Sequence, residues 1–440
     1  MGLFKSAINK FTEHRHKVRA SDSFPGQQHR SQQVAPQAVL SQAAPAPPPP
    51  ANMPGTLEIQ LVNNSDSSQI YAYITGISLQ ERQGARVLLK ADGRSLYFPE
   101  SPSEIMQPLK EDCAIPLGAP GNTTTVHIPQ IAGGRIWFSR DAKLTFMLNP
   151  GPALVEPSVL NPSDPNAAVD FAFAEFTYND QQLYANISYV DFVPRLPVAL
   201  TLQTVTSAVQ HVSGMPPDGL NQVAQRLRDQ AAKDGKPWDK LIVPQPGSSS
   251  PLRALNPTHG DAVGANFSGY YEPLVEQVWA KYRAQPNSPS SSLKINTQAG
   301  PGIVTGQVND KDELIIANEP FNKPTTADIL GCNSGPFTTG ESSVRNAIIP
   351  RLAAGFVRSS ILDVAEQPSK PETFYTRDPT NHYARIVHEV NLDRKGYAFA
   401  YDDVQMDGGE DQSGKVNAGD PRVFIVAVGG KGAYTGDRLP

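Results

Sequence analysis

The chain has 440 residues, which is longer than one typical domain and predicts two domains with an additional tail. A net charge of −5 without a long basic run argues against nucleic acid as a partner, and no apolar run reaches the length of about 18 residues expected of a membrane span. Its two cysteines, Cys113 and Cys332, exclude a disulfide-dense framework and allow either one disulfide or two free, buried thiols.

Residues 1–53 differ in composition from the rest of the chain and are expected to form a disordered tail. The stretch 27–54 is rich in Gln, Ala, Ser and Pro, a composition that cannot bury a core. Ahead of it, Phe4, Ile8 and Phe11 recur at helical spacing among Lys and Arg residues. Such a basic amphipathic segment favours peripheral contact with a membrane.

The first six residues also fit the pattern for N-myristoylation at Gly2. No secretory signal is visible, because Lys5, Asn9 and Lys10 interrupt the apolar residues. We therefore expect a cytoplasmic or membrane-peripheral location, with unconventional export as an alternative.

Residues 54–205 are expected to form the first part of a β-sandwich. Short alternating runs of apolar and polar residues are separated there by Gly, Pro, Asn and Asp, which is typical of strands with one buried face. The expected strands are 56–62, 70–74, 86–90, 124–128, 135–139 and 144–148.

Residues 206–383 change period and predict a mixed α/β domain. A helix is expected after an N-cap at Asp218, with Gly235 as its stop signal. Further helices are expected at 271–282 and 343–362, the second bent or restarted at Pro350. The expected strands of this region are 293–296, 303–308 and 313–316.

Residues 384–440 are expected to return to the sandwich, with strands at 384–390, 396–401 and 423–428 and a C-terminal tail. The predicted fold is therefore mainly β with α+β character. A mixed domain is inserted into a discontinuous sandwich, and a groove is expected where the two meet.

Two carboxylates, Glu175 and Asp191, are placed where strands would bury them. Alternation predicts two shared faces, because residues i and i+2 of a strand point the same way. The first face comprises Phe171, Phe173, Glu175 and Thr177, and the second comprises Ile187, Tyr189, Asp191 and Val193.

Two interpretations of this pair are open from the residues alone. The carboxylates are either a general acid and base separated in pKa by their environments, or structural residues in ion pairs, with Arg135 as a partner. Their separation depends on the hairpin. A turn centred at residue 183 would set Glu175 opposite Asp191, whereas a shorter turn would offset them along the strands.

The sequence around the pair resembles glycoside hydrolase family 64, a family of β-1,3-glucanases whose main domain is similar to thaumatin-like proteins. The resemblance covers about residues 55–430 and rests on motifs in a fixed order. These motifs are RIWFS (135–139), KL (143–144), NPGP (149–152), PSV (157–159), NPSDPN (161–166), EFTYN (175–179), GYYEPLVEQVW (269–279), GCNSGPF (331–337), RIVHEV (385–390) and YAFAYDDV (397–404).

The resemblance implies hydrolysis of β-1,3-glucan with inversion, releasing short oligosaccharides, with Glu175 as general acid and Asp191 as general base. It places Thr177, Asn179 and Tyr184 at sugar-binding positions, although the family has an indole where Tyr184 stands. A non-catalytic β-glucan-binding protein is the alternative function.

Asp402 and Asp403 are either turn residues after a strand or, by the resemblance, a pair of which one faces the acidic cleft and orients sugar hydroxyls or tunes Glu175. Tyr270, Tyr271 and Trp279 are candidates for sugar stacking, although the helical position of Trp279 favours the core for it. No metal is expected, because neighbours such as His388 and Glu389 point to opposite faces of a strand. No cofactor is expected either, and the protein is predicted to be a monomer.

Overall fold

The computed structural model describes residues 55–283 and 292–430. The predicted tail (1–53), with Gly2 and its predicted acylation, therefore lies outside the described residues. Within the described ranges no helix is both long and apolar enough to cross a membrane. Cys113 and Cys332 are free and buried, so the alternative without a disulfide is confirmed.

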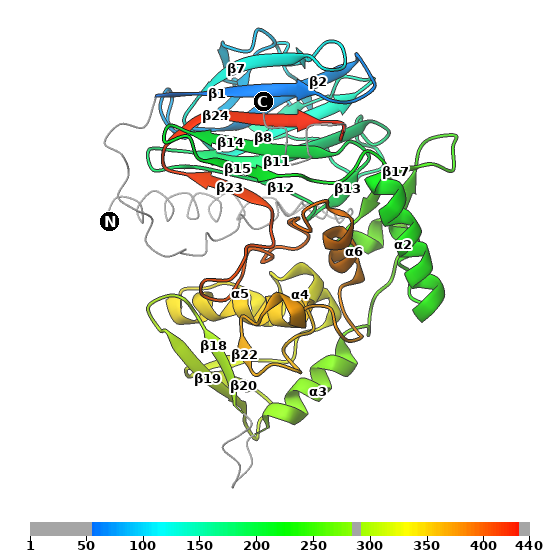
Figure 1. Cartoon of the computed structure of the whole chain (residues 1–440), viewed down its shortest axis with the longest axis vertical. Coiled ribbons are helices and arrows are strands. Elements are labelled where there is room, and N and C mark those ends of the chain that lie inside the picture. The colour runs from blue at the N-terminus through cyan, green and yellow to red at the C-terminus, as the bar shows by residue number, and fades with distance from the viewer. Residues whose placement is uncertain (1–54, 284–291, 431–440) are drawn as a thin grey trace. The chain divides into compact units, whose positions relative to one another are not determined.

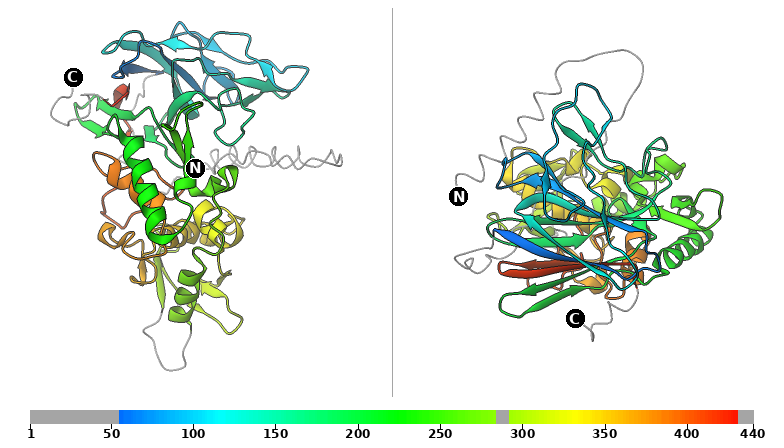
Figure 2. Two further views of the ribbon diagram at one scale, coloured as in Figure 1. Left: turned by 90° about the vertical axis from the view of Figure 1, so that its right-hand side faces the viewer. Right: turned by 90° about the horizontal axis from the view of Figure 1, so that it is seen from above.

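A five-stranded sheet joins segments from both ends of the described chain. Its strand order is β15 (Val209–Val212), β14 (Val198–Thr204), β24 (Pro421–Val428), β1 (Thr56–Asn63) and β7 (Thr123–Pro129). The two outermost segments in sequence, β1 and β24, pair in parallel, and Figures 1 and 2 show them side by side in blue and red. The strand predicted at residues 423–428 is confirmed as part of β24.

An eight-stranded sheet faces the first one and carries the candidate site. Its order is β23 (Lys415–Ala418), β12 (Leu183–Ile187), β11 (Asp170–Tyr178), β8 (Ile131–Arg140), β2 (Ile70–Ser78), β3 (Arg86–Leu89) and β4 (Leu96–Tyr97), with β6 (Ile115–Pro116) on β2.

Apolar residues from facing sides of the two sheets form one core. Alternate residues of β1 and β11 enter it, as their period-2 patterns require. The contributing residues include Leu57, Ile59, Leu61, Ala172, Ala174, Phe176, Leu200, Leu202, Phe424 and Val426. The two sheets therefore form a sandwich.

The other face of the eight-stranded sheet buries an aromatic cluster, in which Trp137 lies 4.9 Å from Phe173 between ring centroids. Phe171 also belongs to this cluster. A small sheet of β5 (Gln107–Pro108), β9 (Met147–Asn149) and β10 (Ala153–Val155) is formed by nearby loops. The strand expected at 144–148 is thus shorter and begins at Met147.

The middle of the chain is mixed α and β, as predicted. A sheet of β13 (Phe192–Pro194), β17 (Pro251–Leu255) and β16 (Ile242–Pro244) precedes a five-stranded sheet. The latter has the order β21 (Glu319–Phe321), β20 (Leu314–Ile316), β19 (Ile303–Val308), β18 (Leu293–Asn296) and β22 (Glu366–Gln367). The α-helices of the described residues are α2 (Gly219–Asp234), α3 (Glu272–Tyr282), α4 (Thr326–Gly331), α5 (Ser343–Val357) and α6 (His382–Val390), labelled in Figure 1.

Helix α2 begins after Asp218, whose side chain makes no capping hydrogen bond, and ends at Asp234. Gly235 follows it with a left-handed backbone (φ 68°), which suits a glycine. Helix α5 is continuous through Pro350, so a restart there is wrong, and the helix ends at Val357 and not at residue 362 as predicted. Nearly all of its residues from Ile348 onward are buried, and this packing outweighs the one backbone hydrogen bond that proline removes.

Two predicted strands near the C-terminus are wrong. Residues 384–390 belong to helix α6, and residues 396–401 form a loop with a single bridge, from Tyr397 to Ser188. The buried positions of α6 include Tyr383, Val387 and Val390, which recur at helical spacing. Short runs of β-branched residues fit both periods, and burial against neighbouring elements decides between them.

Candidate active site

Glu175 stands in a polar row that crosses four strands of the eight-stranded sheet. Arg135 on β8 is opposite Glu175 on β11, which is opposite Asn186 on β12, and Asn186 is opposite Lys415 on β23. Directly paired residues share a face of a sheet. Phe171 and Phe173 are on the aromatic face, so the predicted face of Glu175 is confirmed, and its side chain is 35% exposed.

Arg135 is bonded to two glutamates. Its Nε and Nη2 donate to Oε1 of Glu175 at 3.3 and 3.2 Å, and its Nη1 donates to Oε2 of Glu156 at 2.8 Å. The predicted partnership of Arg135 with Glu175 is therefore confirmed. Burial opposes the charge of Arg135, but the carboxylates of Glu156, Glu175 and Asp191 outweigh it and raise the pKa of the guanidinium.

Asp191 lies in the segment between β12 and β13, outside both strands. Its Oδ1 is 3.1 Å from Nε2 of His259, and its carbonyl accepts a hydrogen bond from the amide of Asn256 at 2.9 Å. Burial raises the pKa of Asp191, but the hydrogen bond and charge of His259 and the charge of Arg135 outweigh burial, so the pKa is lowered. The carboxylate is therefore held in its ionised form.

The hairpin between β11 and β12 is short, because the amide of Asn179 bonds to the carbonyl of Gln182. Glu175 is consequently opposite Asn186, and the second of the two predicted pairings, the offset one, is found. The predicted face of Asp191 is wrong. Its alternating neighbours Ile187, Tyr189 and Val193 enter the sandwich core, whereas Asp191 remains 29% exposed beside His259.

Thr177 and Tyr184 form the next row of the same face, two residues along from Glu175. Thr177 accepts a hydrogen bond from the amide of Gly133 at 3.3 Å through its Oγ1. Burial raises the pKa of Tyr184, with further contributions from the charges of Asp403, Asp411 and Glu175. The charges of Glu175 and Asp403 therefore both act on Tyr184.

Asn179 has a structural contact in the turn itself. Its Oδ1 accepts the amides of Gln181 and Gln182, each at 2.9 Å, which is the local bonding that favours Asn in turns.

The adjacent Asp402 and Asp403 have different surroundings. Asp402 is 1% exposed and pairs with Arg358 and His388, so it is part of the interior. Asp403 is partly exposed, and burial first, then the charge of Asp411, raise its pKa against the opposing effects of Lys415 and Tyr397. Asp402 is therefore part of the interior, whereas Asp403 stays partly accessible.

Comparison with known proteins decides the family. A model of the β-1,3-glucanase family matches residues 55–428. Glucan endo-1,3-beta-glucosidases from Cellulosimicrobium cellulans and from Arthrobacter sp. (strain YCWD3) are 29% and 30% identical over 92% of this chain and 69% of their own length. The chain belongs to glycoside hydrolase family 64.

The solved structures agree with this assignment. A laminaripentaose-producing β-1,3-glucanase in complex with laminaritetraose superposes with a TM-score of 0.74 and is 31% identical, covering 85% of this chain and 99% of that one. This family 64 protein is therefore a glycoside hydrolase of the β-1,3-glucanase type, as the resemblance in its motifs implied.

Sequence reasoning missed two side chains of this glucanase's candidate site. Glu156 accepts a hydrogen bond from Arg135, the partner of Glu175, and His259 contacts Asp191 directly. Glu156 follows β10, and His259 lies in a short 3-10 helix, Pro257–Val263. Neither segment has a period that would place its side chains on a particular face. Glu156 immediately precedes the quoted PSV motif, which was the available signal for it.

The predicted aromatic candidates Tyr270, Tyr271 and Trp279 all belong to the buried core. Trp279 was expected there, and the two tyrosines donate through their hydroxyls to buried carbonyls of Thr380 and Val357. The stacking role considered for the tyrosines does not fit this burial.

The premise used against a metal was wrong, because His382, His388 and Glu389 lie on helix α6 and not on a strand. Within residues 55–283 and 292–430, no group of three or more His, Cys, Asp or Glu side chains could hold a metal ion. His388 is instead bonded to Asp402.

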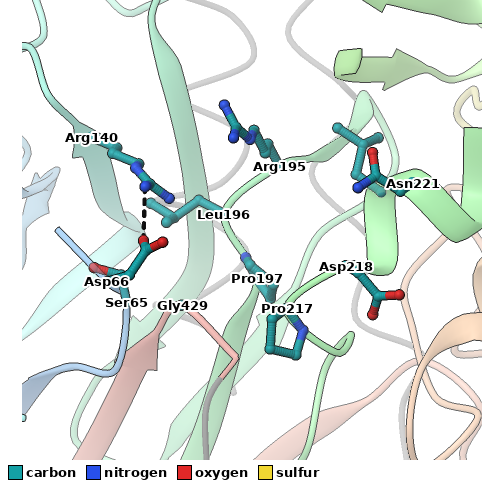
Figure 3. Close-up of a pocket in the computed structure, with 11 residues that line it drawn as sticks. Ser65, Asp66, Arg140, Arg195, Leu196, Pro197, Pro217, Asp218, Asn221 and Gly429 are labelled. Carbon is teal, nitrogen blue, oxygen red and sulfur yellow. Dashed lines mark ion pairs between the residues drawn. The ribbon is translucent and has the colours of Figure 1, made fainter. Parts of the chain in front are cut away.

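A pocket of about 230 Å³ lies away from these residues, at the end of the sandwich (Figure 3). Arg140 forms an ion pair there with Asp66 at 2.7 Å, and Arg195 and Asp218 also line it. None of the predicted site residues lines this pocket. Its mixture of both charges does not indicate one class of ligand.

Proposed function

We propose that this family 64 glucanase hydrolyses β-1,3-glucan with inversion of the anomeric carbon, releasing short β-1,3-oligosaccharides. Glu175 is the general acid and Asp191 the general base. The observation that carries the proposal is that one cation, Arg135, hydrogen-bonds to Glu175 and also lowers the pKa of Asp191 by its charge, with both carboxylates partly exposed.

The two carboxylates have surroundings that suit different roles. Asp191 is held ionised by His259 and Arg135, which is the form that removes a proton from the attacking water. Glu175 shares Arg135 with another carboxylate and would protonate the leaving glycosidic oxygen. An inverting reaction needs the two carboxyl groups about 6.5–9.5 Å apart, with the water between base and sugar.

Sugar binding extends along the same face of the sheet in this proposal. The residues that follow Glu175 are Thr177, Asn179 and Tyr184. The charge of Asp403 acts on Tyr184 and raises its pKa. Tyr184 offers a phenol ring for stacking against a sugar. Asp402, being buried, would act on the sugar only by supporting the loop that presents Asp403.

We further propose that the sandwich is of the thaumatin-like kind and that the glucan lies in a groove between it and the mixed domain of residues 206–383. The position of Glu175 on the face opposite the sandwich core supports this. The divisions at residues 54, 206 and 384 remain predictions.

The deciding experiment measures reducing sugar released from linear β-1,3-glucan by the wild type, Glu175→Gln and Asp191→Asn. Proton NMR follows the anomer of the first product. We expect α-anomeric product from the wild type and losses of at least about 10³-fold from either variant. Glu389→Gln is the matched control. It removes a carboxylate that, like Glu175, forms ion pairs with arginine, and it should retain activity.

Two results would overturn parts of the proposal. A β-anomeric first product would exclude inversion, because inversion of a β-linkage yields the α-anomer. Binding of the glucan without hydrolysis would favour the alternative function, a non-catalytic glucan-binding protein.

A further inference from the structure

The guanidinium of Arg135 is shared unequally between two glutamates. The bond from Nη1 to Glu156 is 2.8 Å, whereas both bonds to Glu175, from Nη2 and Nε, exceed 3.1 Å. Arg135 also lies over the ring of Phe173, with Cζ 4.8 Å from the ring centroid. The cation is thus fixed in place, and its stronger contact is to the glutamate with no proposed role in proton transfer.

Glu156 is itself held by a chain of two hydrogen bonds that starts at the buried Trp137. Nε1 of Trp137 donates to Oγ1 of Thr75 at 3.1 Å, and Oγ1 of Thr75 donates to Oε1 of Glu156 at 3.2 Å. The direction is determined, because an indole N–H can only donate and the hydroxyl therefore has its own hydrogen for Glu156. Both oxygens of Glu156 accept, one from Thr75 and one from Arg135, as an ionised carboxylate does.

We propose that Glu156 is a positioning residue that fixes Arg135 and offsets its charge, so that Glu175 retains the proton it gives to the leaving sugar oxygen. A cation beside a carboxyl group favours the ionised form of that group. An Arg135 bonded to Glu175 alone would therefore favour loss of the proton from the general acid. This inference rests on the proposed function of Glu175.

Other charged or titratable groups lie on the elements around Glu175, and a substitution of Glu156 replaces none of them. The same groups are therefore present when the wild type and the variant are compared. They are Arg135 on β8, Asp191 before β13, Tyr184 on β12, Tyr397 and Asp403 in the loop after α6, and Asp411 and Lys415 at β23.

The test is the pH dependence of kcat on linear β-1,3-glucan for the wild type and Glu156→Gln. Glutamine keeps the size of the side chain and removes its charge. We expect the alkaline limb of the profile to move to lower pH by about one unit, with KM nearly unchanged. Glu156→Asp, which keeps the charge, should restore most of the wild-type profile, and Glu389→Gln should leave it unmoved.

A second readout does not depend on activity. Carbon NMR of glutamate-labelled protein follows the carboxyl of Glu175, assigned with Glu175→Gln, through a pH titration. Its midpoint should fall in Glu156→Gln and fall by a smaller amount in Glu156→Asp, which keeps the charge on a shorter side chain. This titration also decides the matter if Glu156→Gln folds poorly, because Glu156→Asp should then differ from the wild type in the same direction.

The two proposals fail in different ways. Hydrolysis that requires Glu175 but has the same alkaline limb in wild type and Glu156→Gln would overturn the role of Glu156 alone. Equal loss of activity at every pH with unchanged NMR midpoints would assign Glu156 a merely structural role. Absence of hydrolysis by the wild type would overturn the proposed function, while the NMR midpoints would still test the coupling of Glu156 to Glu175.

Discussion

At the scale of single residues, the proposed base depends on one imidazole. His259 contacts Asp191 at 3.1 Å and comes from a segment more than sixty residues away in the chain. Its hydrogen bond and charge are the largest effects that lower the pKa of Asp191 against burial. Burial alone would push the carboxyl toward its protonated form, which cannot act as a base.

We therefore predict that His259→Gln moves the acidic limb of the kcat/KM profile to higher pH. The sign follows from the linkage: loss of His259 raises the pKa of Asp191, so the base becomes protonated at a higher pH and activity falls earlier on acidification. We expect the acidic limb to move by about one pH unit. His127→Gln, a substitution at an exposed histidine of β7, is the control, and an equal displacement in both variants would contradict the prediction.

The two proposed catalytic residues differ in how far sequence could place them. Glu175 lies inside a long strand, where alternation fixes its face and the apolar neighbours Phe171 and Phe173 identify that face. Asp191 lies five residues beyond Asn186, in a segment whose path depends on a bridge from Ser188 to Tyr397. Such a distant contact leaves no local pattern in the sequence.

At the scale of elements, helix α6 is tied to the loop that presents Asp403. His388 contacts Oδ2 of Asp402 at 2.9 Å through Nε2 and the carbonyl of Arg394 at 3.1 Å through Nδ1. Arg358 donates to Oδ1 and to the carbonyl of Asp402. A carboxylate and a carbonyl can only accept, so both ring nitrogens of His388 donate and the ring is an imidazolium.

This arrangement predicts a stability that depends on pH. Burial disfavours the charge of His388, but Asp402 and the carbonyl of Arg394 outweigh burial and raise its pKa above 6.5. The contribution to the free energy of unfolding is therefore full below about pH 6.5 and is lost as pH rises through the raised pKa. We expect His388→Gln to cost about 3 kcal/mol at pH 6.5 and clearly less at pH 9.

Urea denaturation of wild type and variant between pH 6.5 and 9 measures this difference. The window avoids His382, whose pKa burial lowers to about 4 and which therefore titrates at lower pH. His127→Gln again serves as the exposed control. A difference in unfolding free energy that stays constant across the window would show that His388 is not charged in the folded protein.

The prediction for this helix from sequence was wrong for a physical reason. Residues 384–390 alternate Ala, Ile and His with Arg, Val and Glu, which satisfies a period of two. The buried set Tyr383, Ile386, Val387 and Val390 satisfies the helical period equally well. Asn381 resolves the ambiguity, because its side chain accepts the amide of Ala384 and begins a helix there.

At the scale of the whole molecule, the C-terminal strand lies inside the sheet that begins the fold. Strand β24 pairs in parallel with β1 and antiparallel with β14, so it has neighbours on both sides. Its residues Phe424, Val426 and Val428 enter the sandwich core. Sequence could predict that a strand exists at 423–428, but not its central place, because a parallel partner is chosen by packing across the full chain length.

We predict that a chain ending at residue 418 does not fold cooperatively. It lacks β24 and leaves β1 and β14 with unpaired edges in the middle of a sheet. Three buried core side chains of about 1.5–3 kcal/mol each are lost with the strand, and their sum is comparable to the whole stability of a typical domain. Thermal unfolding by circular dichroism and calorimetry should show no cooperative transition.

The matched control is a chain of residues 55–430. It contains the two sandwich sheets, the core between them, the aromatic cluster and every residue of the candidate site. All contacts described for Glu175, Asp191 and Arg135 lie within these limits. The chain of residues 55–430 should therefore unfold cooperatively and hydrolyse linear β-1,3-glucan at a rate within about twofold of the full chain.

If the chain ending at 418 kept a sharp transition and the same activity, β24 would be an accessory strand. If instead residues 55–430 were inactive although folded, the segments outside them would have to contribute to the site.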